Sequence, residues 1–199
     1  MSLRLSGGRR LHSPPGTLAR PTSARVRQAV LNLLARELPG SRWLDPCCGS
    51  GVMACEVLQR GVREVVAIER DRRIAAVARA NLDAVASSLG PPAERPAVRV
   101  VAADALSWLR RSMPGTNGGT LEEGGVRRGR FDLIYLDPPW PAALHAPLSE
   151  VIGRGSWLQP GGTLVWECPS EAIPPLPESW TCRDQRRYGG STVLLLEQV

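Results

Sequence analysis

Short apolar runs that each end at an acidic residue recur along the first two thirds of the chain. They close at Asp45, at Glu69, just before Asp104 and at Asp137. Each run has the length of a strand buried on both faces, and the segments between them leave room for helices. This alternation predicts an α/β fold with a parallel sheet. The four carboxylates would then lie along the edge where such sheets bind ligands, although any one of them could instead cap the helix that follows.

The last third of the chain ends in a different pattern. The stretch from Trp180 and the run Ser191 to Glu197 are separated by Tyr188-Gly189-Gly190, which predicts an antiparallel β-hairpin. Earlier in the chain, residues 111–130 are rich in glycine and have no apolar period. We expect a long flexible loop there.

The first 40 residues predict a small folded extension. Leu3, Leu5 and Leu11 flank Gly7-Gly8 and indicate a hairpin. Ser23 is a suitable N-cap for a following helix. The apolar residues of this helix recur at helical spacing, at Val26, Val30, Leu33 and Leu34, and Arg25 and Arg27 would lie off that stripe.

Charge adds to this picture. The chain has 199 residues with 43% hydrophobic content, which fits one domain with a sizeable core. Residues 1–42 carry eight arginines and one acid, whereas the rest carries seventeen arginines and eighteen acids. We therefore expect residues 1–42 to bind a polyanion, such as a nucleic acid. The alternative is that they form only a solvated basic terminus. The candidate residues for binding this polyanion are Arg4, Arg9, Arg10, Arg20, Arg25 and Arg27.

Several classes of function receive little support. Five cysteines without paired C-x-x-C spacing and two distant histidines predict neither a metal site nor a disulfide framework, and they indicate a reducing cytoplasm. Neither histidine lies beside a candidate nucleophile, and His145 is expected at the surface, at the start of a helix. No apolar stretch approaches the roughly 20 residues that cross a bilayer, so we expect a soluble protein with no membrane partner.

The segment Asp137-Pro138-Pro139-Trp140 carries the clearest chemistry. It places a carboxylate, a rigid carbonyl and an aromatic plane at one strand end. An amino group conjugated to a ring is a poor nucleophile. Hydrogen bonds from its N–H groups to Asp137 and to the Pro138 carbonyl would orient its lone pair while Trp140 stacks on the ring. The alternative is a proline turn beside a core tryptophan.

A second turn follows the first strand. Gly49 and Gly51 lie between this strand and a helix, an arrangement that lets a nucleotide approach the backbone and the helix N–H groups. Cys47 stands where the dinucleotide fingerprint has its first glycine, so a dehydrogenase is not favoured. Glu69 falls near the spacing at which such folds present an acid to ribose hydroxyls. The alternative is a tight turn before a buried helix.

These segments resemble the class I, S-adenosylmethionine-dependent methyltransferases, and among them the ribosomal RNA small subunit methyltransferase D family. The Arg20-Pro21-Thr22 segment and its following helix are the narrower marker of that family. The resemblance is carried by Arg4, Ser6-Gly7-Gly8, Arg10, Leu11, Arg20-Pro21-Thr22, Arg25 to Asn32, Leu44-Asp45, Gly49-Ser50-Gly51, Ile68-Glu69-Arg70-Asp71, Asn81-Leu82, Asp104-Ala105, Asp137-Pro138-Pro139 and Tyr188-Gly189.

The resemblance implies a Rossmann-like fold. A mostly parallel seven-stranded sheet would carry helices on both faces, a C-terminal antiparallel hairpin and a small basic N-terminal hairpin-plus-helix extension. Residues 1–40 would form the extension, which faces RNA, and residues 41–199 the methyltransferase domain.

The resemblance also implies an activity. The chain would be a cytoplasmic monomer that transfers a methyl group from S-adenosylmethionine to the N2 amine of a guanine in 16S ribosomal RNA, within an assembled or assembling small subunit. No metal is expected. The cofactor would be held by Asp45, Gly49, Gly51, Glu69, Arg70, Asp104 and Ala105, and the substrate base by Asp137, Pro138, Pro139 and Trp140.

Three alternatives share these motifs. DNA adenine methyltransferases use the same turn, but this short chain has little room for a target-recognition region. Protein glutamine methyltransferases usually have Asn in place of Asp137. A non-catalytic RNA-binding module with the same fold is the third alternative, against which the intact acids argue.

Overall fold

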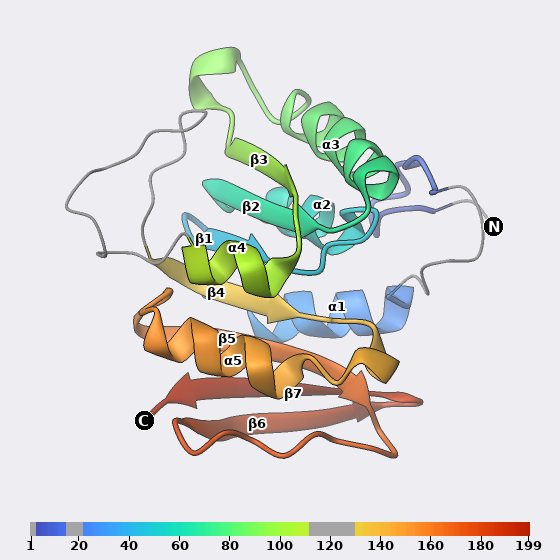
Figure 1. Cartoon of the computed structure of the whole chain (residues 1–199). Coiled ribbons are helices and arrows are strands. Elements are labelled where there is room, and N and C mark those ends of the chain that lie inside the picture. The colour runs from blue at the N-terminus through green and yellow to red at the C-terminus, as the bar shows by residue number, and fades with distance from the viewer. Residues whose placement is uncertain (1–2, 15–21, 112–129) are drawn as a thin grey trace.

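The computed structural model describes residues 3–14, 22–111 and 130–199, which form one seven-stranded sheet with helices on both faces (Figure 1). Two of the predictions fall outside the described residues. They are Arg20 and, apart from its ends, the glycine-rich loop.

The sheet is mixed. Its strands are, in chain order, β1 (Arg42–Asp45), β2 (Glu64–Glu69), β3 (Ala97–Ala102), β4 (Phe131–Leu136), β5 (Leu158–Pro169), β6 (Trp180–Tyr188) and β7 (Ser191–Gln198). Their order in space is β3-β2-β1-β4-β5-β7-β6. The first five strands pair in parallel, and β7 pairs antiparallel with both β5 and β6. The mostly parallel sheet and the antiparallel C-terminal hairpin are thus confirmed.

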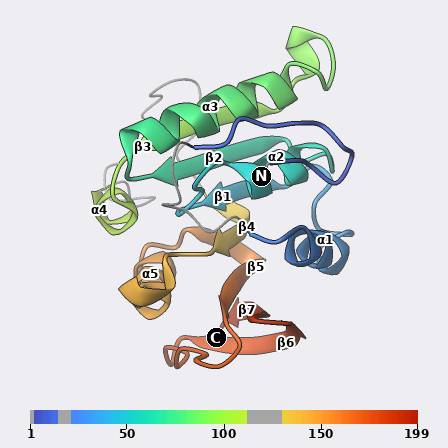
Figure 2. The same cartoon turned by 90° about the vertical axis from the view of Figure 1, so that its right-hand side faces the viewer.

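Helices cover both faces of this sheet. They are α1 (Ala24–Leu33), α2 (Val52–Leu58), α3 (Arg72–Ala86), α4 (Ala105–Arg111) and α5 (His145–Arg154), with short 3-10 turns η1 (Pro92–Glu94) and η2 (Trp140–Ala142). Figure 2 shows α4 and α5 together on one side of the sheet, and α1 and α2 on the other. No helix in the described ranges has the length and apolar character needed to cross a membrane.

Alternation along the strands explains the two layers of helices. Trp43 and Leu44 are adjacent on β1, and each is fully buried in a different core cluster. Successive side chains of a strand point to opposite faces, so a run that is apolar at every position must be covered on both sides. The cluster around Trp43 includes α1, α2 and α3, whereas the cluster around Leu44 includes α4 and α5. Full burial of one such side chain contributes roughly 1.5–3 kcal/mol.

The strand order reverses between β1 and β4. From β1 the chain proceeds to β2 and β3 on one side, and from β4 it proceeds to β5 on the other. Such a switch point leaves a crevice at the carboxyl ends of the two strands, where open α/β sheets bind ligands. Asp45 ends β1 and Asp137 directly follows β4.

The N-terminal segment packs on the α1–α3 side of the sheet. An antiparallel bridge joins Arg4 and Arg10, and the Leu5 N–H donates to the Arg9 carbonyl at 2.9 Å, as expected for the small hairpin. Ser23 caps α1 by accepting from the Val26 N–H at 3.2 Å. Leu5 and the buried residues of α1 belong to the same core cluster as the sheet. The boundary after residue 40 stays a prediction.

His145 begins helix α5 as expected, but the expectation that it lies at the surface is wrong. The residue is 2% exposed, and its Nε2 lies 2.8 Å from the Glu167 carbonyl oxygen. The ring also packs against Trp166, with centroids 5.1 Å apart. Because α5 begins with this residue turned toward the sheet, burial lowers the pKa of His145.

Candidate active site

The carboxyl edge of the sheet gathers the acidic residues that the sequence predicts there. Asp45 and Glu69 are the last residues of β1 and β2, Asp104 follows β3 by two residues, and Asp137 follows β4 by one. The electrostatic influence of Asp137 and Glu69 reaches Asp45. The edge therefore carries concentrated negative charge and favours a cationic ligand.

Asp45 is the most deeply buried of these acids, at 1% exposure. Burial raises the pKa of Asp45 well above its ordinary value, a hydrogen bond from the Cys47 N–H opposes that rise, and repulsion from Asp137 and Glu69 adds to it. The Cys47 bond is long, at 3.3 Å. A cation bound beside Asp45 would lower this pKa again, because it would stabilise the ionised form.

The loop after β1 has the backbone geometry that its glycines predict. Gly49 and Gly51 have φ angles of 52° and 76°, which lie in the left-handed region. A Cβ at Gly51 would lie 3.3 Å from the Ala78 Cβ, whereas a Cβ at Gly49 would meet open space. The loop can therefore pack closely on α3 at Gly51 and receive a ligand at Gly49.

Glu69 fixes this loop from the next strand. Its Oε2 accepts from the Gly49 N–H at 3.1 Å, and its Oε1 accepts from the Asp71 N–H at 2.9 Å. Asp71 in turn caps α3 by accepting from the Arg73 and Ile74 N–H groups. The acid expected to meet a ribose thus lies directly beside the glycine loop.

The two cysteines of this loop take no part as thiolates. Cys48 is buried and Cys47 is half-buried. Burial raises the pKa of both thiols, and the nearby Asp45 and Glu69 carboxylates raise it further. Both thiols remain protonated at neutral pH, so they act through packing and backbone shape.

Asp104 caps α4, which is the alternative noted for a strand-end acid. Its Oδ1 accepts from the Ser107 N–H at 2.8 Å, and this backbone hydrogen bond is the main cause that lowers the pKa of Asp104. The residue is exposed, as is Arg70, while Ala105 is buried as the first residue of α4. Capping holds the carboxylate at the carboxyl edge of the sheet.

The Asp137–Trp140 turn links β4 to α5. Pro138 is buried, Pro139 is exposed, and Trp140 begins η2. The Thr22 hydroxyl donates to Asp137 Oδ2 at 3.0 Å. In the sequence Thr22 is marked only as part of the Arg20-Pro21-Thr22 segment, because local pattern gives no sign of a contact across 115 positions.

A buried polar cluster lies on β4, β5 and β7 just behind this turn. The Tyr135 hydroxyl donates to Glu167 Oε2 at 2.5 Å, and the Ser191 hydroxyl donates to Glu167 Oε1 at 3.0 Å. Burial raises the pKa of Tyr135, and the Glu167 charge raises it further, so the phenol stays a donor. Glu167 is not among the residues predicted from the sequence, although a lone acid inside the apolar run of β5 indicates a paired buried charge.

Five of the six predicted RNA-facing arginines lie in the described residues, and they divide into three groups. Arg4, Arg10 and Arg25 are exposed. Arg9 is half-buried and donates to the Ser88 hydroxyl and the Ala84 carbonyl at the end of α3. Exposed and half-buried side chains can both reach a partner, so the RNA role of these residues stays a prediction.

Arg27 forms the third group, and its predicted position off the apolar face is wrong. Its side chain is buried, at 4% residue exposure, and its Nε lies 3.1 Å from Glu56 Oε1 of α2. It follows Val26 directly and precedes Val30 by three residues, so it turns inward with them once Glu56 supplies the compensating charge. Glu56 stands out in the sequence as the one acid of a helix that is otherwise apolar.

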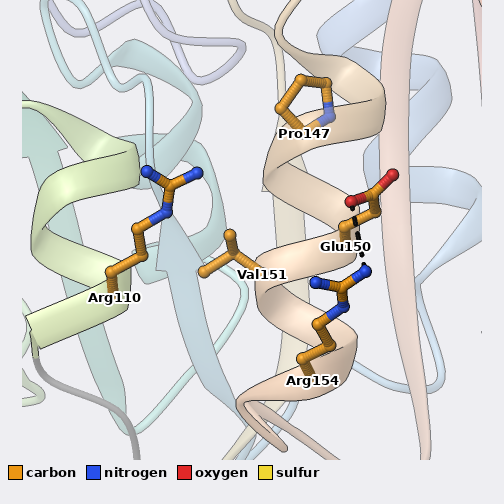
Figure 3. A pocket seen from close by; sticks show the side chains of 5 residues that line it. All are labelled: Arg110, Pro147, Glu150, Val151 and Arg154. Carbon is orange, nitrogen blue, oxygen red and sulfur yellow. Dashed lines mark ion pairs between the residues drawn. The ribbon is translucent and has the colours of Figure 1, made fainter.

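A hollow lies elsewhere, between α4 and α5 (Figure 3). Arg110 faces Val151 across it, and the Glu150–Arg154 ion pair of 3.7 Å closes one side. The hollow is lined by Arg110, Pro147, Glu150, Val151 and Arg154, and none of these is a candidate site residue. Arg110 lies at the C-terminal end of α4, whereas Asp104 caps its N-terminal end. The hollow is therefore separate from the candidate active site.

The strand order, with an antiparallel β7 inserted between β5 and β6, and the acidic carboxyl edge define a class I methyltransferase fold. Within that class, residues 5–197 match the family described as "Conserved hypothetical protein 95", and the chain belongs to this family.

Individual relatives agree with that placement. Ribosomal RNA small subunit methyltransferase D of Haemophilus influenzae is 26% identical over 170 residues, which cover 85% of this chain and 78% of that protein. The protein of the same name from Escherichia coli is 26% identical over 183 residues, which cover 92% and 81%. The structure of the yhhF protein of Escherichia coli superposes with a TM-score of 0.77 at 24% identity, over 100% of this chain and 98% of that one.

Proposed function

We propose that this protein transfers a methyl group from S-adenosylmethionine to the exocyclic N2 amine of a guanine in 16S ribosomal RNA. The observation that carries the proposal is the position of Asp137 at the β1–β4 switch point, beside the buried Asp45 and the glycine loop. The family membership and the names of the curated relatives support ribosomal RNA as the substrate class.

The residues of the edge fit S-adenosylmethionine. The cofactor carries a positive charge, which the ionised Asp45 would favour, and Glu69 is held where it could accept from ribose hydroxyls. Gly49 leaves open space for close approach, and Asp104 and Ala105 lie at the start of α4 for the adenine end. When bound, the cofactor supplies an activated methyl group on its sulfonium.

The chain's own contribution is orientation of the acceptor. The Asp137 carboxylate and the Pro138 carbonyl would accept from the two amine N–H groups and turn the nitrogen lone pair toward the methyl carbon. As the N–C bond forms and the C–S bond breaks, positive charge develops on nitrogen, and Asp137 would stabilise it. The proton then leaves to water. Trp140 would stack on a base that has left its helix stack.

The N-terminal segment would hold the RNA. Arg4, Arg10 and Arg25 are exposed on it, and arginine contacts to phosphate supply affinity without sequence preference. A small ribosomal subunit, assembled or assembling, is the proposed partner, with the protein acting as a cytoplasmic monomer.

A transfer assay tests this proposal. Labelled S-adenosylmethionine is incubated with small ribosomal subunits that lack native modifications, and separately with naked ribosomal RNA, duplex DNA and a protein extract. We expect label in N2-methylguanosine of the subunit RNA, and none with Asp137→Ala, whose cofactor affinity should stay close to wild type. Label confined to DNA or protein would reassign the substrate, and cofactor binding without any transfer would favour a non-catalytic RNA-binding module.

A further inference from the structure

Thr22 connects the N-terminal segment to the acceptor turn. Its hydroxyl lies 3.0 Å from Asp137 Oδ2. An ionised carboxylate only accepts hydrogen bonds, so the hydroxyl must be the donor. A bond of this kind, to a charged acceptor, is stronger and more directional than one between neutral groups.

Thr22 is itself held from two directions. It directly precedes Ser23, whose hydroxyl caps α1, so its backbone position follows from the start of that helix. In addition, an Arg27 Nη donates to the Thr22 carbonyl at 2.7 Å. The hydroxyl that meets Asp137 therefore belongs to a residue whose backbone has little freedom.

The partner that holds Thr22 is the buried ion pair Arg27–Glu56. The second Arg27 Nη donates to the Arg4 carbonyl at 2.7 Å, and Glu56 Oε1 accepts from the Ser6 N–H at 2.9 Å. The pair thereby joins the hairpin, the start of α1 and helix α2, which follows the glycine loop. Buried ion pairs contribute little net stability because both charges lose their hydration. We therefore infer that the Arg27–Glu56 pair, with its bonds to Thr22, Arg4 and Ser6, mainly fixes the relative positions of these segments.

We propose that Thr22 is a positioning residue for methyl transfer: its hydroxyl sets the plane of the Asp137 carboxylate, and the Arg27–Glu56 pair sets Thr22. This inference rests on the proposed function. The acceptor amine must present its lone pair in line with the methyl carbon, and misplacement of a reacting group by about 1 Å can cost about 100-fold in rate. A carboxylate turned about its own axis would present its oxygens to the amine in the wrong plane.

Three variants of threonine hydroxyls test the inference. Thr22→Val removes the hydroxyl and keeps the shape, and Thr22→Ser keeps the hydroxyl. Thr163→Val is the matched control, because it removes a buried hydroxyl that donates to Glu37 at 2.9 Å, away from the candidate site. We expect Thr22→Val to lower kcat about 10- to 100-fold, with the KM for subunits and the Kd for S-adenosylmethionine unchanged. Thr22→Ser should retain most of the rate. Thr163→Val should lower the unfolding temperature and leave kcat at the wild-type value.

A double-mutant cycle tests the second half of the proposal. Arg27→Lys keeps the charge but loses the fork that reaches the Thr22 carbonyl and Glu56 together. Assayed well below its unfolding temperature, it should lower kcat in the wild-type background and add little in the Thr22→Val background, because the two changes break the same chain of contacts. Fully multiplicative losses would show that Arg27 does not act through Thr22.

The other outcomes separate this inference from the proposed function. Wild-type protein that transfers no methyl group would defeat the proposed function itself. Wild-type transfer matched by Thr22→Val would defeat only the inference, and so would equal losses in kcat and in cofactor affinity. A faster Thr22→Val enzyme would mean that the hydroxyl competes with the substrate amine for Asp137.

Discussion

The two sides of the candidate site are held in different ways. On the cofactor side, Glu69 accepts from Gly49 across 20 positions of sequence, inside one strand–helix–strand unit. On the acceptor side, Asp137 accepts from Thr22 across 115 positions. The Glu69–Gly49 bond can therefore form within that unit alone, whereas the Thr22–Asp137 bond requires the N-terminal segment to be docked. We expect loss of the Thr22 hydroxyl to lower the rate of methyl transfer and to leave cofactor binding unchanged.

Arg27→Met should produce the largest effect on stability. It leaves Glu56 buried without its partner, which costs about 3–5 kcal/mol. Arg25→Met, two residues away on the exposed side of α1, should cost less than about 0.5 kcal/mol. Denaturant unfolding of both variants measures the difference. Equal stabilities would mean that Glu56 finds another partner or water.

Replacing the two glycines of the loop should have intermediate effects on the cofactor side. An L-residue at φ 76° costs roughly 1–2 kcal/mol, and at Gly51 the new Cβ also meets Ala78 at 3.3 Å. Gly49→Ala carries only the backbone cost, since nothing lies near its Cβ. We expect Gly51→Ala to lose more stability, and Gly49→Ala to weaken cofactor binding with a smaller loss, as measured by thermal unfolding and calorimetry. The reverse ranking would contradict the packing of Gly51 on α3.

Asp45→Asn should separate stability from cofactor binding. Because the pKa of Asp45 is higher in the folded state than in the unfolded state, ionisation of this carboxyl disfavours folding. The stability associated with protonated Asp45 is fully present below the unfolded-state pKa. It is lost as the pH rises through the folded-state pKa. The variant should therefore be more stable than wild type at neutral pH without cofactor.

The same variant should bind S-adenosylmethionine more weakly, by about tenfold or more, since a hydrogen bond to a charged group contributes about 1.5–3 kcal/mol. Wild-type affinity should fall as pH is lowered through the raised pKa of Asp45, and the variant should lose this dependence. Titration calorimetry over a pH series checks both statements, and a wild-type affinity that stays constant would remove Asp45 from the cofactor site.

Arg25→Ala should give the smallest effect, on RNA binding alone. Loss of one phosphate contact lowers the slope of log K against log salt by about 1. Arg63→Ala is the matched control, because Arg63 is 62% exposed and precedes β2, at the opposite edge of the sheet from the site. Filter binding at several salt concentrations measures both slopes. Equal changes in slope for the two variants would mean that α1 carries no specific RNA-binding surface.

The sequence predicted the parts of this molecule that depend on neighbours in the chain. The strand ends at Asp45 and Glu69 and the cap at Ser23 follow from local pattern and intrinsic preference, and the structure agrees with them. Arg27 and His145 were misplaced because each turns inward to a partner, Glu56 or the Glu167 carbonyl, that lies far along the chain. An arginine beside an apolar stripe carries no local sign of whether the facing helix offers a carboxylate.

The order of strands also bears on when the site can form during synthesis. β7 lies between β5 and β6 but follows both in the chain, so the edge of β5 has no antiparallel neighbour until β7 has emerged. An unpaired apolar edge is a point of aggregation while it persists. Ser191, which completes the bonds of Glu167 behind the acceptor turn, arrives with β7. During synthesis the glycine loop could thus form early, whereas the Ser191–Glu167 hydrogen bond behind Asp137 forms last.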